Sequence, residues 1–160
     1  MAEEINGIKR PPPIKCRTYI NADPERIYQT LTTGEGWDCW FTRGTEVDAR
    51  QGGHIVLRWV DWGVDHYTND AGGPVVEAEP PVRFAFQWNS GDSKTTITFV
   101  LRPHGQGTIV QVEETGYTMS ERDMQALVEC ASGWGEALAL LKVYLEHGVI
   151  YGPVPEAESV

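Results

Sequence analysis

The sequence has 160 residues, of which 41% are hydrophobic and 22% are charged, and these values suit one globular domain. Its 13 basic and 23 acidic residues give a net charge of −10, which disfavours nucleic acid and anionic membrane surfaces as partners. With no Cys-x-x-Cys pair, no signal peptide and no stretch of about 18 apolar residues, we expect a cytoplasmic protein with three free thiols and no membrane insertion, the cysteines being Cys16, Cys39 and Cys130.

The first third of the chain predicts an extension, a strand and two helical segments. Residues 1–13 form the N-terminal extension, in which Pro11-Pro12-Pro13 is stiff. Ile14–Asn21 alternates with β-branched and aromatic residues, which is typical of a strand. Asp23-Pro24 combines a good N-cap with a first-turn proline and predicts a helix. Residues 37–41 are expected to form a second, short helical turn.

The period of the sequence then changes to two. Six strands are predicted, at residues 45–49, 54–62, 74–78, 82–88, 95–102 and 108–116, separated by glycine-rich turns such as Ala71-Gly72-Gly73. Short connections favour an antiparallel meander, and the alternation favours one packed face and one wet face.

The last predicted element is a helix from Ser120 to His147. It carries one apolar stripe with spacings of three and four, formed by Met124, Leu127, Val128, Ala131, Trp134, Leu138, Leu141 and Leu145. The concave face of the sheet is the only large apolar surface that can bury this stripe. We therefore predict a single α+β domain over residues 14–150, followed by a flexible tail at residues 151–160.

The order of these elements resembles the START-like (SRPBCC) helix-grip superfamily. Within it, the chain is similar to the family related to the C-terminal domain of the activator of the heat-shock-protein-90 ATPase. The resemblance rests on the order and spacing of short segments, which are 22–28, Trp40-Phe41, Gly52-Gly53, 76–88, Gly133-Trp134, Leu138, Leu141 and Leu145-Glu146. It implies a curved antiparallel sheet of about six to seven strands around the final helix, with an internal cavity. It does not imply one activity, because such a fold serves ligand carriers, cyclases, aromatases and cochaperone domains.

Aromatic residues are the main candidates for a ligand site. The predicted ligand-binding residues are Trp40, Phe41, Trp59, Phe84, Phe86, Trp88, Trp134 and Leu138. The alternative is that these side chains only fill the core. Gly133 and Gly135 flank Trp134 inside the helix, where they either leave space for a ligand or allow a close approach to the sheet or a loop.

Charged candidates for chemistry are fewer. Glu114 is expected to point inward, where burial would suit it for general acid or base catalysis, and Glu77 is a second candidate. The alternative for either residue is an ion pair at a sheet edge, with an arginine such as Arg58 or Arg83. The polar segment 61–66 together with Asp70 matches no metal-ligand spacing, so neither a metal nor a cofactor is predicted.

Three functional hypotheses follow. The first is a non-enzymatic binding protein for a small hydrophobic or aromatic molecule. The second is a cyclase-like or aromatase-like enzyme that uses Glu114. The third is a cochaperone-type module of the stress response, with a chaperone or a second copy of the chain as its partner.

Overall fold

The computed structural model describes residues 3–151. Its elements are β1 (Glu3–Ile5), β2 (Ile8–Arg10), β3 (Ile14–Ile20), α1 (Pro24–Thr32), α2 (Gly34–Asp38), β4 (Glu46–Val47), β5 (His54–Trp62), β6 (Tyr67–Glu79), β7 (Arg83–Asn89), β8 (Lys94–His104), β9 (Gly107–Thr115) and α3 (Glu121–His147). The predicted tail at residues 151–160 lies, apart from its first residue, outside the described part of the chain.

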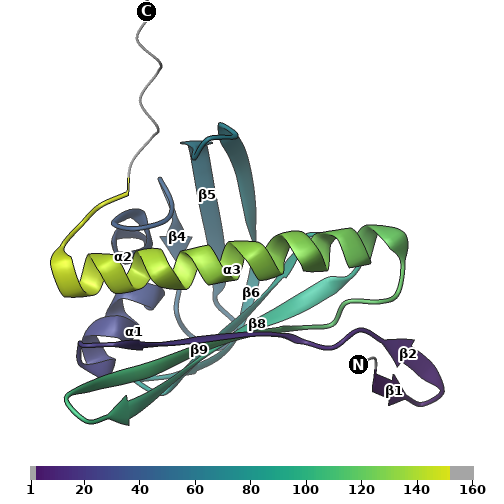
Figure 1. The fold of residues 1–160 in the computed structure, drawn as a ribbon, viewed down its shortest axis with the longest axis horizontal. Helices are drawn as coiled ribbons and strands as arrows, with labels where there is room; N and C mark the ends of the chain where they lie inside the picture. The colour runs from purple at the N-terminus through teal and green to yellow at the C-terminus, as the bar shows by residue number, and fades with distance from the viewer. Residues whose placement is uncertain (1–2, 152–160) are drawn as a thin grey trace, which may run out of the picture.

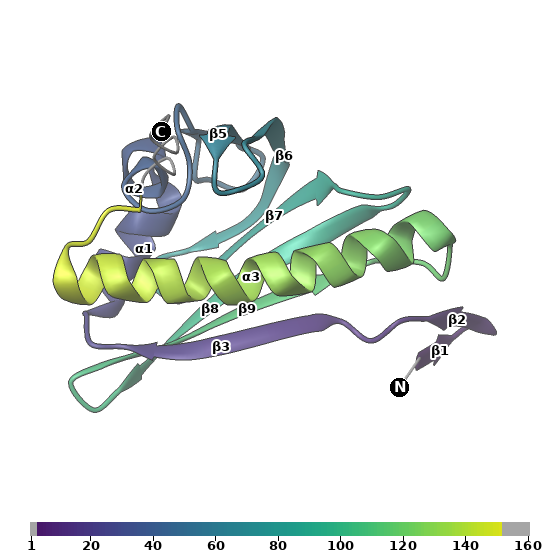
Figure 2. The same cartoon turned by 45° about the horizontal axis from the view of Figure 1, so that its top comes forward.

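Seven strands form an antiparallel sheet in the order β3-β9-β8-β7-β6-β5-β4. The sheet is curved and α3 runs across it, closest to the edge strand β3 (Figure 1). The second view shows α1 and α2 at the end of the molecule where α3 finishes (Figure 2). The predicted α+β helix-grip fold is confirmed. Within residues 3–151, no helix is both long and apolar enough to cross a membrane.

Side chains alternate along the central strands as the period of two predicts. In β8, Ile97, Phe99 and Leu101 are buried, whereas Thr96 and Thr98 between them are partly exposed. Successive residues of a strand point to opposite faces, so β8 contributes one apolar face to the core and one mixed face to the outside.

α3 has well-defined ends. The side chain of the N-cap Ser120 accepts a hydrogen bond from the Asp123 amide at 3.1 Å, and Gly148 at the C-cap has a left-handed φ of 66°. The predicted stripe is wrong at Val128, which is 67% exposed. The first turns of the helix instead direct Ala126 towards the sheet, and Val128 lies roughly 200° further around the helix axis.

β6 differs most from its prediction, since it begins seven residues before residue 74. Ala71-Gly72-Gly73, interpreted from sequence as a turn, pairs with β5 inside the strand. A Cβ on Gly72 would lie 2.0 Å from the carbonyl oxygen of Ile55, and one on Gly73 would lie 2.4 Å from that of Gln87. Glycine here permits close approach of the neighbouring strands rather than a turn. The chain turns instead between the end of β5 and the start of β6, and the hairpin stands away from α3 (Figure 1).

Two smaller differences lie nearer the N-terminus. α2 begins at Gly34 rather than at residue 37, because the Thr33 side chain caps it by accepting a hydrogen bond from the Gly36 amide at 3.0 Å. Residues 3–10, inside the predicted extension, form the β1–β2 hairpin, which lies beyond the start of β3 in both views (Figure 2).

Candidate functional site

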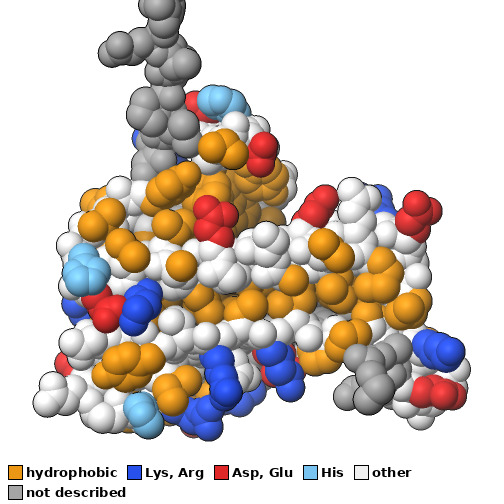
Figure 3. All heavy atoms as spheres, in the orientation of Figure 1, with side chains coloured by type: hydrophobic (Ala, Val, Ile, Leu, Met, Phe, Trp, Pro, Cys, Tyr) orange, Lys and Arg blue, Asp and Glu red, His pale blue; other side chains and the backbone are white. Residues whose placement is uncertain are grey.

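A cleft of about 720 Å³ lies between α3 and the β5–β6 hairpin. This volume is in the usual range for small-molecule sites. Seven aromatic side chains line it, namely Phe41, Trp59, Trp62, Tyr67, Trp88, Trp134 and Tyr151. In the space-filling view, hydrophobic side chains gather above α3 beside the hairpin (Figure 3). The cleft is therefore lined by aromatic and other apolar side chains, with polar and charged residues among them.

Two groups of rings form its walls. Trp88 of β7 and Trp134 of α3 are stacked, with centroids 5.5 Å apart and an interplanar angle of 26°. On the hairpin side, the ring of Phe41 meets Trp59 and Trp62 edge-to-face at 5.4 and 5.3 Å. Such offset and edge-to-face arrangements are the favourable ones for aromatic rings, so both walls are well packed.

A bulge brings Trp62 to the same wall as Trp59. Residues three apart in a regular strand point to opposite faces. The register of the β5–β6 pairing shifts between these two tryptophans, and Asp61 between them has a φ of 50°. The bulge therefore turns a second indole into the cleft.

Glu114 of β9 is fully buried behind the Trp88–Trp134 pair. Its Oε1 accepts hydrogen bonds from Trp88 Nε1 at 2.8 Å, Thr95 Oγ1 at 2.7 Å and the Tyr117 hydroxyl at 2.8 Å. Its Oε2 accepts one from Trp134 Nε1 at 2.9 Å. Four donors satisfy a buried carboxylate without a positive partner. The predicted inward direction of Glu114 is confirmed, and the alternative of an edge ion pair with arginine is wrong for this residue.

The two indoles separate Glu114 from the cleft. Trp88 and Trp134 line the cleft whereas Glu114 does not. Because both indole N–H groups are directed at the carboxylate, the cleft is left with the apolar parts of these rings. Glu114 thus orients the wall and does not touch a molecule bound in front of it.

A chain of hydrogen bonds leads from Glu114 to the cleft. The Tyr117 hydroxyl lies 2.8 Å from Ser90 Oγ, and Cys130 Sγ lies 3.6 Å from the same oxygen. Ser90 and Cys130 both line the cleft. Burial raises the pKa of the Tyr117 hydroxyl, and burial followed by the charge of Glu114 raises the pKa of the Cys130 thiol, so both groups stay protonated at neutral pH.

Asp123, in the first turn of α3, holds the turn that contains Ser90 against the start of this helix. Its Oδ1 accepts hydrogen bonds from the amides of Asp92 and Ser93 at 2.7 and 3.1 Å, and its Oδ2 accepts from the amide and hydroxyl of Thr118 at 2.7 and 2.6 Å. Burial acts to raise the pKa of Asp123, but the hydrogen bonds from Thr118 and Ser93 hold it well below its ordinary value. A Cβ on Gly91 would lie 2.4 Å from Asp123 Oδ1, so only glycine fits there.

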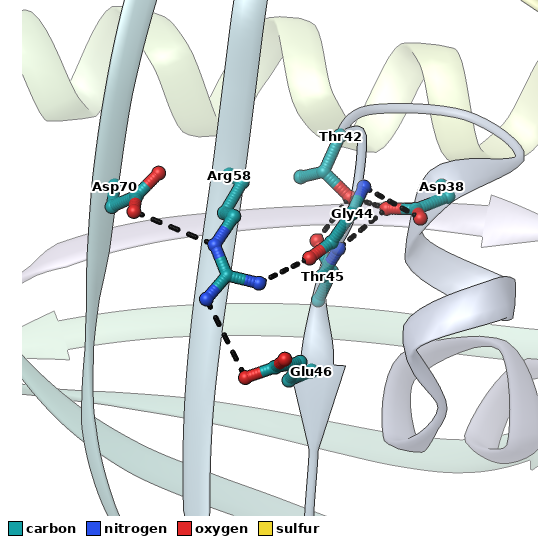
Figure 4. Close-up of polar contacts among 7 residues, drawn as sticks. All are labelled: Asp38, Thr42, Gly44, Thr45, Glu46, Arg58 and Asp70. Carbon is teal, nitrogen blue, oxygen red and sulfur yellow. Dashed lines mark hydrogen bonds and ion pairs between the residues drawn. The ribbon is translucent and has the colours of Figure 1, made fainter.

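A second anchor holds the loop that follows Phe41. Asp38 accepts hydrogen bonds from Thr42 Oγ1 at 2.8 Å and from the amides of Gly44 and Thr45 at 2.8 and 3.1 Å (Figure 4). These bonds close the loop into a compact turn, which fixes the position of the Phe41 ring at its start.

Arg58 joins this loop to the hairpin. It lies on the face of β5 opposite the cleft and donates a hydrogen bond to the Gly44 carbonyl at 2.6 Å (Figure 4). It also contacts Glu46 and Asp70 at 3.4 Å each. Ion pairs with such exposed carboxylates contribute little stability. Their effect is to align β4, β5 and β6 behind the aromatic wall.

The two helix glycines beside Trp134 differ in their surroundings. A Cβ added to Gly133 or to Gly135 would meet no atom within 4 Å, so the predicted alternative of close approach to the sheet or a loop is wrong. Gly133 lines the cleft and Gly135 does not. The missing side chain at Gly133 therefore leaves space at the cleft, as the other alternative expects.

The structure divides the eight predicted ligand-binding residues into two sets. Phe41, Trp59, Trp88 and Trp134 line the cleft, whereas Trp40, Phe84, Phe86 and Leu138 are buried and do not line it. A role in ligand binding stays a prediction for the four residues that line the cleft. The cleft residues that were not predicted from the sequence as ligand-binding include the aromatic residues Trp62, Tyr67 and Tyr151, together with Ser90 and Cys130. Tyr67, at the start of β6, carried a usable signal as an aromatic residue bordering the polar segment 61–66.

The other charged candidates lie outside the cleft or at its edge. Glu77 pairs with Arg83 at 3.0 Å, as one predicted alternative expects. His66 Nδ1 lies 2.6 Å from Asp61 Oδ1, and both side chains are more than 60% exposed. Among residues 3–151, no group of three His, Cys, Asp or Glu side chains is placed to hold a metal ion.

Comparisons with known proteins agree with this architecture. A family model described as activator of Hsp90 ATPase homolog 1-like protein matches residues 21–146. No curated protein matches the chain.

Several solved structures are similar. The Aha1 dimer from Colwellia psychrerythraea gives a TM-score of 0.69 at 25% identity, with 86% of this chain and 98% of that chain covered. A protein from Rhodobacter sphaeroides gives 0.68 at 28% identity, covering 83% and 91%. The protein SSP2350 from Staphylococcus saprophyticus gives 0.72 at 23% identity, covering 89% and 98%, and at that identity it shows the fold alone.

Proposed function

We propose, from the premise that this chain belongs to the family of activator of Hsp90 ATPase homolog 1-like proteins, that it is a cytoplasmic binding protein for a small hydrophobic or aromatic molecule. The site is the cleft between α3 and the β5–β6 hairpin.

The seven aromatic side chains around the cleft carry this proposal. Removing apolar surface from water is favourable by roughly 25 cal/mol per Å², so a ligand that covers these rings gains binding free energy. The walls are held by specific contacts, Glu114 behind one and the Asp38 and Arg58 contacts behind the other. A site with its walls already in place loses little entropy on binding.

The test uses paired variants in α3 and a panel of aromatic compounds. Binding is measured by tryptophan fluorescence and by the shift of the melting temperature. Gly133→Leu places a side chain in the cleft, and Gly135→Leu places the same side chain outside it. We expect the first variant to lose binding and the second to keep it. The proposal fails if no compound binds the natural sequence, or if the two variants bind alike.

The enzyme hypothesis has less support. Direct acid or base catalysis by Glu114 requires contact with the bound molecule, and two indoles lie between them. Any turnover of a bound compound that survives Glu114→Gln would exclude this role.

A second candidate function is a chaperone-type interaction, which the family description and two exposed apolar side chains favour. On the hairpin, Val60 is 45% exposed and Val64 is 74% exposed. If these side chains contact a chaperone of the Hsp90 class, the protein changes the ATPase rate of that chaperone, and a Val60→Ser, Val64→Ser variant does not. An unchanged rate with the natural sequence would count against the candidate.

A second copy of the chain is a further candidate partner, because the Colwellia relative is described as a dimer. Light scattering after size-exclusion chromatography measures this directly. A monomeric mass across the concentration range would remove the candidate.

A further inference from the structure

The polar end of the cleft has a defined hydrogen-bond direction. Each hydroxyl carries one proton. Tyr117 donates its proton to Glu114 Oε1 at 2.8 Å, so its oxygen accepts from the Ser90 hydroxyl at 2.8 Å. Because the Ser90 hydroxyl donates its proton to Tyr117, its oxygen can only accept from Cys130, whose thiol donates to Ser90 Oγ at 3.6 Å. Every proton of the chain is therefore donated to another member of the chain.

Glu114 fixes this direction. The indole N–H groups of Trp88 and Trp134 can only donate, and each is directed at one oxygen of Glu114. The carboxylate therefore acts as the acceptor at which the chain ends. Ser90 lies near the other end of the chain and lines the cleft. Among residues 3–151, the weak thiol of Cys130 is the one donor to Ser90 Oγ in this chain, so this oxygen keeps acceptor capacity for a stronger donor.

The charged groups around the cleft are mainly acidic. Asp65, Glu129 and Glu136 line it, against the single guanidinium of Arg122. Arg122 also lies 3.8 Å from Asp92, which offsets part of its charge. With a net charge of −10 on the whole chain, an anionic ligand is repelled.

We infer that the cleft selects aromatic molecules that carry an O–H or N–H donor, over isosteres without that proton and over aromatic carboxylates. This inference rests on the proposed ligand-binding function. The donor bonds to Ser90 Oγ in place of the thiol of Cys130, while the aromatic ring lies against Trp88 and Trp134.

One group on the opposite wall would favour the reverse selectivity. The Tyr67 hydroxyl accepts a hydrogen bond from Asn69 Nδ2 at 2.8 Å, and its own proton is available to a ligand acceptor. Tyr67 is 46% exposed, so water competes for that proton and the bond contributes less than one at the enclosed end.

The experiment compares three naphthalenes by fluorescence titration of the full chain. We expect 2-naphthol to bind about tenfold tighter than 2-methoxynaphthalene, the ratio that corresponds to one net hydrogen bond. We expect 2-naphthoate to bind more weakly than either. Ser90→Ala should reduce the advantage of 2-naphthol to within about twofold and leave 2-methoxynaphthalene unchanged. Cys130→Ala should keep the advantage, because the acceptor remains.

Ser132→Ala is the matched control, since Ser132 lines the cleft outside the hydrogen-bonded chain. Equal binding of 2-naphthol and 2-methoxynaphthalene would overturn the inference and leave the binding function intact. So would preferred binding of 2-naphthoate, or an equal effect of Ser132→Ala and Ser90→Ala. Failure of all three compounds, together with failure of the wider aromatic panel, would instead contradict the proposed function.

Discussion

The two halves of α3 face very different surroundings. In the C-terminal half, Leu138, Leu141 and Leu145 are at most 4% exposed, and Arg26 of α1 donates a hydrogen bond to the Leu145 carbonyl at 3.1 Å. In the N-terminal half, Cys130 and Gly133 face the open cleft. One apolar helix face therefore completes a filled core at one end and lines a binding site at the other.

The difference arises from the elements opposite the helix. α1 and α2 close the space at the C-terminal end, whereas the β5–β6 hairpin, next to α2, stands away from the middle of the helix (Figure 2). We therefore expect substitutions in the filled half to change the free energy of unfolding. Substitutions in the open half should mainly change ligand binding.

The largest expected effect is in the filled half. Leu141→Ala removes a fully buried side chain and should lower the free energy of unfolding by about 3–4 kcal/mol. Cys130→Ala, in the open half, should lower it by less than about 1 kcal/mol, because cleft and solvent already surround part of the side chain. Urea denaturation measures both. Equal losses would abolish the distinction between the halves.

Asp123→Asn tests the junction between the turn and the helix. The side-chain amide of asparagine cannot accept all four hydrogen bonds, because its nitrogen is a donor. We therefore expect the free energy of unfolding to fall by about 3 kcal/mol at neutral pH. Because the pKa of Asp123 is lowered in the folded state, its stabilisation is present above about pH 4, the unfolded value, and is lost as the pH falls towards the folded value. The natural sequence should therefore lose stability more steeply than the variant between about pH 4 and pH 2. Parallel pH profiles would contradict this assignment.

Glu114→Gln tests the support behind the tryptophan wall. The side-chain nitrogen of glutamine would face an N–H or O–H donor at either of the two oxygen positions. We therefore expect the free energy of unfolding to fall by about 2 kcal/mol and the tryptophan emission to change. Glu113→Gln is the control, since the neighbouring side chain points to the other face of β9. If both variants keep the natural emission and stability, Glu114 does not hold the wall.

The smallest expected effect is a gain. Gly133→Ala and Gly135→Ala each add a methyl group to open space in a helix and should stabilise the protein by about 0.5–1 kcal/mol. Thermal unfolding should show similar gains. Only Gly133→Ala should change ligand affinity, and an equal change at Gly135 would mean that the cleft does not end where the structure places it.

Much of the fold could be predicted because it follows from periodicity. Alternation gave β5 its observed bounds of His54–Trp62, and the N-cap Ser120 and C-cap Gly148 defined α3 to within a residue. Gly72 and Gly73 were misinterpreted because glycine marks both turns and close strand contacts, and only the neighbouring strands decide between them.

The site could be predicted only in part. A period of two shows that Phe86 and Trp88 share a face, but it does not show which of them meets a filled core and which meets a cleft. The inward direction of Glu114 followed from the pattern. Its indole partners did not, because Trp88 and Trp134 lie 46 residues apart in the sequence and meet only through the tertiary structure.

The bonds made by Asp123 have a consequence for motion. They fasten the turn that carries Ser90 to the first turn of α3, so the polar end of the cleft moves as one body with the helix. The hairpin wall is tied elsewhere, through Arg58 to the loop before β4. The two walls of the cleft are thus held by separate sets of contacts, so a shift of the hairpin wall leaves the junction between the Ser90 turn and α3 intact. We expect a bulkier guest to be accommodated by displacement of the hairpin, while the hydrogen-bonding point keeps its distance from the stacked indoles.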